Sequence, residues 1–114
     1  MIDFEFGGGG IGNTGGTLSI ANSTIYGNVD KGLCGPNPHV GGIVNNENGE
    51  IWLGSVTITN NNTSDASSTG GVFSSNDSRL YFFNTIIARN GENNNNQGHD
   101  CGGKSIGIML VSCG

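Results

Sequence analysis

The chain has few charged residues, and positive charge is the scarcest. Only 11% of its 114 residues are charged, and four Lys and Arg against nine Asp and Glu give a formal net charge of −5 at pH 7. Without a basic patch, the chain lacks the electrostatic attraction on which nucleic-acid binding depends. Disordered chains combine low hydrophobicity with high charge and no pattern. Hydrophobic residues here make up 33% but follow a regular pattern, so we expect a folded chain that does not bind nucleic acid.

Long apolar runs are also missing. Residues 1–6 are short and acidic and do not resemble a signal peptide, and no apolar run approaches membrane-spanning length. We therefore expect no membrane insertion. If the protein is exported, its signal has been removed or the sequence is a piece of a longer chain.

The spacings that mark common metal and phosphate sites are absent too. There is no CxxC or HExxH, and the glycine-rich start is followed by no P-loop lysine. Glu47, Glu50 and Asp77 lie in corresponding turns, where they either cluster around a cation or remain separate solvated acids. We expect no catalytic residue, no bound metal and no cofactor.

Glycine, with 22 residues, is abundant and marks a repeat. A Gly-Gly pair opens three similar units, and the second and third read GGIVNNENGEIWLGSVTITNN and GGVFSSNDSRLYFFNTIIARN. The aligned columns are Gly9, Gly41 and Gly70; Ile11, Ile43 and Val72; Leu18, Ile51 and Leu80; Ile20, Leu53 and Phe82; Ile25, Ile58 and Ile87; and the closing Asn28, Asn61 and Asn90. Units of this length that cannot bury their own apolar side are expected to stack.

Each unit is expected to contain three short strands. In the second unit they lie near residues 42–44, 50–53 and 56–59, because β-branched residues are frequent and no i, i+3, i+4 apolar stripe persists. Side chains alternate between the faces of a strand. The inward set is Leu18, Ile20, Ser23 and Ile25 in the first unit, Ile51, Leu53, Val56 and Ile58 in the second, and Leu80, Phe82, Thr85 and Ile87 in the third. Trp52 and Tyr81 then point outward.

A polar column occupies the corner between the second and third strands, at Asn22, Ser55 and Asn84. These residues either form a side-chain ladder from unit to unit or serve only to turn the chain. Long polar loops are expected on one edge, at residues 29–40, 62–69 and 91–105.

Several short motifs carry a family resemblance. They are Gly9-Gly10-Ile11, Ser23-Thr24-Ile25, Gly41-Gly42-Ile43, Val56-Thr57-Ile58, Asn84-Thr85-Ile86-Ile87 and Asp100-Cys101. With them the chain resembles the right-handed parallel β-helix repeats of bacterial surface and secreted proteins, such as the polymorphic outer-membrane and adhesin-like families. The resemblance covers nearly the whole chain, although such regions usually run to many more coils.

The resemblance implies an all-β fold, a right-handed parallel β-helix (β-solenoid) of three coils with short strands and long loops on one edge. We expect a single domain over residues 1–114, with repeat units at 9–40, 41–69 and 70–105 and a terminal strand at 106–113. The resemblance also implies an extracellular or cell-surface location.

The ends of so short a solenoid would expose unpaired backbone groups and an open core. Apolar side chains alternate near both ends of the chain, and we expect them to form an assembly interface by β-augmentation. These residues are Ile2, Phe4, Phe6, Ile106, Ile108 and Leu110.

The three cysteines, Cys34, Cys101 and Cys113, allow one disulfide with one thiol left over. A Cys101–Cys113 bond closes the shorter loop, whereas Cys34–Cys101 would join loops on one edge. His99 and Asp100 precede Cys101, but adjacent side chains rarely point at one centre, so a disulfide is favoured over a nucleophile or metal site.

Two functions follow. The first is a non-catalytic extracellular structural solenoid that stacks end to end into a fibre or forms a segment of a surface stalk or adhesin, with self-association through its ends. The alternative is a β-helix that binds or cleaves carbohydrate, in which Trp52 and Tyr81 stack on sugar rings beside the loop edge. Its partners would be glycans or a host or cell surface.

Overall fold

Every described strand of the chain lies in a parallel β-sheet. The computed structural model describes residues 9–31, 39–63, 69–75, 77–91 and 99–103, which contain twelve strands and no helix. The strands are β1 (Ile11–Thr14), β2 (Thr17–Ala21), β3 (Thr24–Tyr26), β4 (Val29–Asp30), β5 (Ile43–Asn46), β6 (Glu50–Gly54), β7 (Thr57–Thr59), β8 (Asn62–Thr63), β9 (Thr69–Ser74), β10 (Arg79–Phe83), β11 (Ile86–Ala88) and β12 (His99–Gly103). Within these ranges, no helix has the length and apolar character to cross a membrane.

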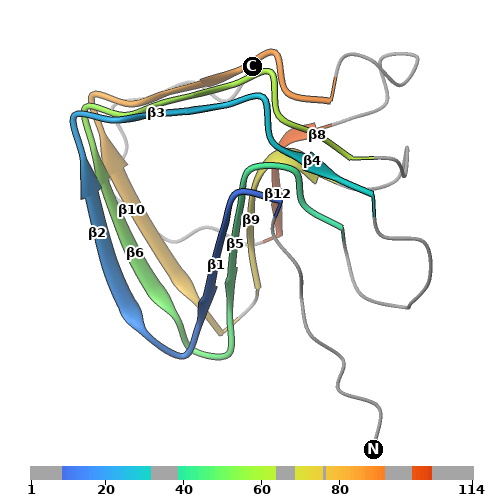
Figure 1. The fold of residues 1–114 in the computed structure, drawn as a ribbon. Helices are drawn as coiled ribbons and strands as arrows, with labels where there is room; N and C mark the ends of the chain where they lie inside the picture. Colours follow the sequence, from blue (N-terminus) through green and yellow to red (C-terminus); the bar gives the residue numbers. More distant parts are fainter. Residues whose placement is uncertain (1–8, 32–38, 64–68, 76, 92–98, 104–114) are drawn as a thin grey trace, which may run out of the picture.

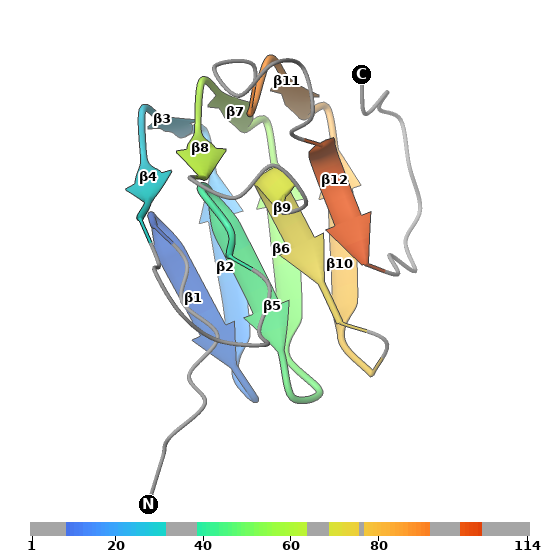
Figure 2. The ribbon, with the colours of Figure 1, turned by 90° about the vertical axis from the view of Figure 1, so that its right-hand side faces the viewer.

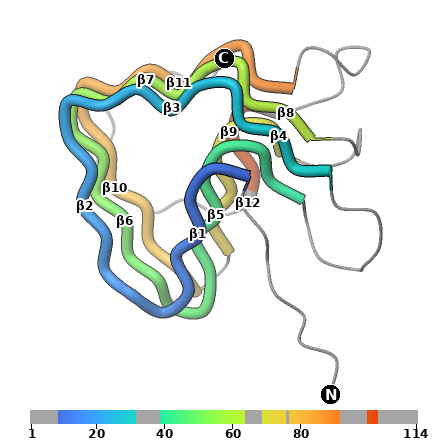
Figure 3. Tube along the Cα trace, in the orientation of Figure 1, coloured from blue at the N-terminus to red at the C-terminus, as the bar shows by residue number. Residues whose placement is uncertain are grey.

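The strands form four sheets, each built from corresponding strands of successive repeat units (Figure 1). The orders are β1-β5-β9-β12, β2-β6-β10, β3-β7-β11 and β4-β8. The tube in Figure 3 shows the second and third units following the path of the first. In Figure 2 the strands β1, β5, β9 and β12 lie side by side, with β2, β6 and β10 behind them. The fold is therefore all-β, with the repeat units lying one beside the next.

The register between units matches the columns of the sequence repeat. Ile11 pairs with Ile43, which pairs with Val72. In the next sheet Leu18, Ile51 and Leu80 share one position, and Ile20, Leu53 and Phe82 share another. Ile25, Ile58 and Ile87 align in the third. Because a one-residue slip would turn every inward side chain outward, this shared apolar pattern sets the register.

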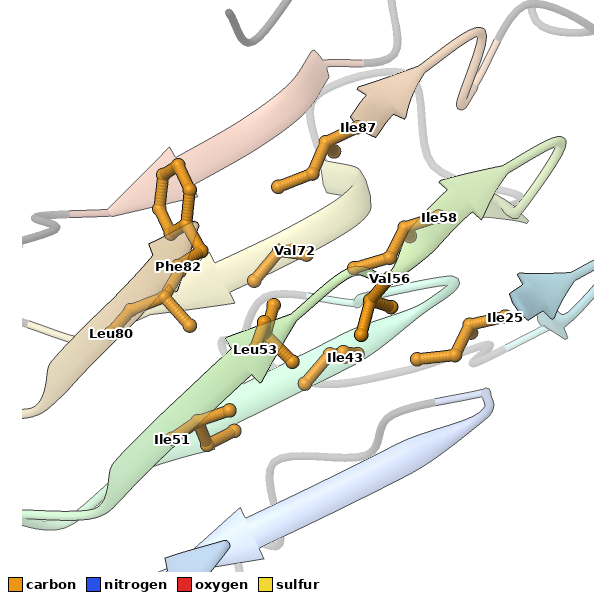
Figure 4. Packing of buried hydrophobic residues seen from close by; sticks show 10 residues of the cluster. All are labelled: Ile25, Ile43, Ile51, Leu53, Val56, Ile58, Val72, Leu80, Phe82 and Ile87. Carbon is orange, nitrogen blue, oxygen red and sulfur yellow. The ribbon is translucent and has the colours of Figure 1, made fainter. Parts of the chain in front are cut away.

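The inward side chains meet between the sheets and form the core (Figure 4). The predicted inward residues of the second and third units are all buried, including the hydroxyl-bearing Thr85. Thr85 Oγ1 donates to the carbonyl oxygen of Phe83 at 3.0 Å, which satisfies its polar atom. The predicted alternation of faces is confirmed for these two units.

Left-handed backbone conformations make the corners. The predicted corner residues Asn22, Ser55 and Asn84 have φ values of 50°, 54° and 47°. Asparagine adopts this region more readily than most non-glycine residues. The corner column therefore turns the chain, which was one of the two roles that the sequence suggested for it.

The Gly-Gly pairs allow neighbouring units to approach closely. A Cβ at Gly10 would lie 2.8 Å from the carbonyl oxygen of Gly42, and one at Gly42 would collide with the carbonyl oxygen of Gly71. A side chain at these positions would force the backbones apart. Glycine at the start of each unit is thus a packing requirement.

The predicted loops at residues 29–40, 62–69 and 91–105 are only partly loop, and this prediction needs correction. The first two begin with β4 and β8, which pair with each other, and the third contains β12, which pairs with β9. Short polar strands carry no apolar alternation, so their backbone pairing leaves no mark in the hydrophobic pattern.

Candidate functional site

A column of amide side chains links the units in the turns that follow β3, β7 and β11. Asn61 Oδ1 accepts hydrogen bonds from the backbone nitrogen and the Nδ2 of Asn28, both at 3.0 Å. Asn90 Oδ1 accepts the same pair from Asn61 at 3.0 Å, and Asp100 Oδ1 accepts the same pair from Asn90 at 2.8 Å. Asn61 and Asn90 are 0% and 2% exposed. We call these four residues the closing ladder.

Backbone partners determine which way each amide of the closing ladder points. Asn61 Nδ2 donates to the carbonyl oxygens of Ile25 at 3.0 Å and Thr59 at 3.2 Å, and Asn90 makes equivalent bonds one unit further on. A carbonyl only accepts and a backbone N–H only donates, so a flipped amide would face like groups. Between side chains, Asn61 and Asn90 therefore donate to the following rung and accept from the preceding one.

The two ends of the closing ladder differ chemically. Asp100 accepts both bonds from Asn90, and an ionised carboxylate has no hydrogen with which to continue the ladder. At the other end, Asn28 donates to Asn61, and no described residue donates to Asn28 Oδ1. Within the described ranges the ladder thus ends in an acceptor without a donor at the first unit and in an acidic terminator beyond the third.

A second amide column, which we call the inner ladder, runs across the sheet of β1, β5 and β9 with the same direction. Asn13 Nδ2 donates to Asn45 Oδ1 at 3.0 Å, and Asn45 Nδ2 donates to Ser74 Oγ at 3.3 Å. Asn45 is fully buried and also donates to the carbonyl oxygen of Arg79 at 2.8 Å. Both interior ladders therefore begin with an asparagine of the first unit.

The predicted corner column bonds only in part. Asn84 Nδ2 donates to Ser55 Oγ at 3.0 Å, and this contact is exposed to solvent. No bond links Asn22 to Ser55 among the described residues. The extended amide ladder lies instead in the column of closing asparagines, and the sequence interpretation placed it at the wrong column. The sequence did contain a signal for the correct column, because all three closing positions are Asn, whereas the corner positions are a mixture of Asn and Ser.

Over the residues that the structure describes, the core is more deeply buried at one end of the stack than at the other. Leu80, Phe82 and Ile87 of the third unit are 2%, 3% and 0% exposed, although β10 and β11 are edge strands. In the first unit, Leu18 and Ile20 are only partly buried, and β2 and β3 are the opposite edges of the same sheets. We call the face formed by β1, β2, β3 and β4 the open end.

An aromatic group lies on the outer face of the sheet of β2, β6 and β10. The rings of Trp52 and Tyr81 stack on each other, with centroids 4.2 Å apart and planes at 20°. Trp52 is 45% exposed, and its Nε1 donates to Glu50 Oε1 at 2.6 Å. Beside them Phe83 crosses over Gly54, where a Cβ would lie 2.7 Å from the ring. The outward orientation predicted for Trp52 and Tyr81 matches this face, and their role as a ligand face stays a prediction.

Two of the three turn acids, Glu50 and Asp77, have separate hydrogen-bond partners, and so does Asp30. Glu50 accepts from Trp52, and Asp77 Oδ1 accepts from Ser75 Oγ at 2.8 Å. Asp30 Oδ2 accepts from the backbone nitrogen of Val40 at 3.2 Å and lies 3.3 Å from His39 Nδ1. Across the described ranges, no three His, Cys, Asp or Glu side chains come together in a way that could hold a metal ion.

Cys101 is disulfide-bonded, and it packs against the core. Cys34 and Cys113 lie outside the described residues, so both pairings considered from the sequence remain open. The six residues of the predicted assembly interface also lie outside them: Ile2, Phe4, Phe6, Ile106, Ile108 and Leu110.

No family model, curated protein or solved structure matches this chain. Any functional assignment must therefore come from the geometry of the chain itself.

Proposed function

We propose that the chain is a non-catalytic structural module, a right-handed parallel β-helix that forms a segment of an extracellular stalk. The proposal covers the handedness, the helical path and the location as well as the role. The proposal is supported by the successive repeat units, which add strands to the same parallel sheets. Amide side chains also form hydrogen bonds from one unit to the next. In such a solenoid each unit is one coil, and stability comes from each coil contacting its neighbours.

The single observation that carries this proposal is the difference between the two ends of the stack. A fibre built by stacking identical chains end to end requires both ends to accept a neighbour. Here the core of the third coil is buried at Leu80, Phe82 and Ile87, whereas that of the first coil is partly exposed at Leu18 and Ile20. One covered end and one open end suit a segment that joins its neighbour at the open end, so we favour the stalk segment over the fibre.

Native-state hydrogen exchange tests this asymmetry. Amides of β10 and β11 should be more strongly protected than those of β2 and β3, because protection follows local stability and burial. Each comparison is between edge strands of the same sheet, so the number of paired neighbours is matched. Equal protection at the two edges would remove the basis of the proposal.

Electron microscopy with light scattering on the purified chain separates the stalk segment from the fibre. The stalk segment predicts discrete particles over a wide concentration range. Filaments a few nanometres wide would show that identical chains do join end to end and that the fibre is correct.

A second candidate, carbohydrate binding, is favoured by the stacked pair on the outer face. Tyr81 stacks on the Trp52 ring, and on the neighbouring strand β2 the small residue Ser19 holds the same register position as Trp52. A sugar ring could stack on the Trp52 face above Ser19, while the Glu50 carboxylate accepts a hydroxyl hydrogen.

A glycan array tests this candidate with a matched control. Trp52→Ala should abolish any saturable binding, whereas Tyr26→Ala, which removes a 64% exposed aromatic from a different sheet, should leave it unchanged. Absence of binding to the unmodified chain, or equal loss in both variants, would rule the site out.

A further inference from the structure

Both interior ladders point the same way, and this bears on which partner the open end can accept. In the closing ladder the bonds between side chains run from one unit to the next, because each amide donates to the side-chain oxygen of the following rung, from Asn28 to Asp100. In the inner ladder Asn13 donates to Asn45 in the same sense. The open end therefore presents side-chain oxygens: no described residue donates to Asn28 Oδ1 or Asn13 Oδ1.

We propose that the open end is an interaction surface for a parallel coil that carries amide donors at the two ladder positions. The inference rests on the proposed function and names the partner of that module. The incoming coil would pair with the outer edges of β1, β2 and β3 and cover Leu18 and Ile20. Its closing asparagine would donate from its backbone nitrogen and its Nδ2 to Asn28 Oδ1, as Asn61 does to Asn90.

The closing ladder also disfavours the covered end of a second copy as the partner of the open end. In that arrangement Asn28 Oδ1 would face the Asp100 carboxylate, whose Oδ1 already accepts two bonds from Asn90. Acceptors placed opposite each other in a buried contact lose their bonds to water without replacement.

The fitting partner is therefore another repeat unit of the same pattern, with Asn at its closing position. Asp100 then has a defined role as the terminator of the closing ladder. A carboxylate at this rung gains charge-assisted bonds from Asn90 and offers no donor to a further rung, so the stack extends in one direction only.

The test adds one coil at the open end of the full chain. A duplicate of residues 41–69 is inserted between Gly8 and Gly9, so that its last residue precedes Gly9 as Thr69 precedes Gly70 in the natural order. Thermal unfolding is followed by far-UV circular dichroism in the natural and the extended chain. The extended chain should unfold at a higher temperature, because the added coil buries Leu18 and Ile20.

The decisive measurement is the effect of Asn28→Ala in each of the two chains. In the natural chain the substitution removes the Nδ2 donor to Asn61 Oδ1, the one side-chain bond that Asn28 makes with the described residues. In the extended chain it also removes the acceptor of both bonds from the added coil, so Tm should fall by a further amount of about 6–12 °C, the shift that two net hydrogen bonds produce in a domain of this size. Asn84→Ala is the control, because its contact with Ser55 is the same in both chains.

The outcomes separate this inference from the proposed function. If the extended chain is more stable but Asn28→Ala costs the same in both chains, coils stack and the ladder does not select the partner. If the extra coil adds neither β-structure nor stability, extension at the open end itself fails, and the proposed function fails with it. Self-association of the natural chain that Asn28→Ala abolishes would also overturn the inference.

Discussion

Asn61→Asp tests the energetic importance of the closing ladder most directly. The substitution replaces one NH2 group by oxygen at a site that is 0% exposed, and the shape of the side chain hardly changes. Three hydrogen bonds are lost, because Nδ2 donates to the carbonyl oxygens of Ile25 and Thr59 and to Asn90 Oδ1, at 3.0, 3.2 and 3.0 Å. The new oxygen would face three acceptors, while the two bonds that Asn28 donates to Oδ1 can remain.

The expected cost is a large part of the total stability. Asn90 Oδ1 keeps its bond from the Asn61 backbone nitrogen, but the carbonyl oxygens of Ile25 and Thr59 lose this donor. These losses, together with a buried carboxylate for which no counter-ion is described, give a cost of about 3–5 kcal/mol. The free energy of unfolding of a single domain is about 5–15 kcal/mol. The variant should therefore unfold at a much lower urea concentration.

Urea unfolding, followed by the fluorescence of Trp52 and by far-UV circular dichroism, gives the free energy of unfolding from the midpoint and the slope. The matched control is Asn84→Asp, which makes the same chemical change at an exposed rung with a φ of 47°. Because Asp also tolerates this conformation, the control should change stability by no more than about 0.5 kcal/mol. If Asn61→Asp costs within about 1 kcal/mol of the control, the closing ladder is not a major source of stability.

Three glycine substitutions test the close approach of the units and the outer aromatic face. Gly42→Ala should destabilise the chain by more than about 3 kcal/mol, because its Cβ collides with backbone that cannot move aside. Gly12→Ala is the control and should cost about 1 kcal/mol or less, because its Cβ meets a side-chain atom of the next strand at 3.7 Å. Equal midpoints for these two variants in urea would show that the collision is relieved at little cost. Gly54→Ala should cost about 1 kcal/mol with Phe83 in place and close to nothing in the Phe83→Ala background, because the three atoms nearest to the new methyl group all belong to the ring. A double-mutant cycle without coupling would show that the ring does not lie over Gly54 in solution.

Much of the strand arrangement could be read from hydrophobic period and repeat alignment. The columns of Ile51, Leu53 and Ile58 and their counterparts became the register of the sheets, since only one alignment places every apolar side chain inward. The outward orientation of Trp52 followed from the same alternation. These features are local and repeated, so the pattern contains them.

Polar pairing was harder to predict. The strands β4, β8 and β12 have no apolar alternation, and they form because a neighbouring backbone is available to bond with. The amide ladder was placed at the corner of Asn22 rather than at the closing asparagines. Both columns are rich in asparagine, and only burial distinguishes a ladder from a turn.

The sequence by itself determined the all-β class, the three units, their alignment and the inward set, because alternation and repetition are properties of the chain order. Only the tertiary structure decided that Asn61 and Asn90 are buried donors, that Asp100 stands at the next rung, and that the core is open at one end. These features depend on which groups from distant segments meet and on which of them remain in contact with water. The direction of the ladders is a property of the stacked units together, and no single repeat contains it.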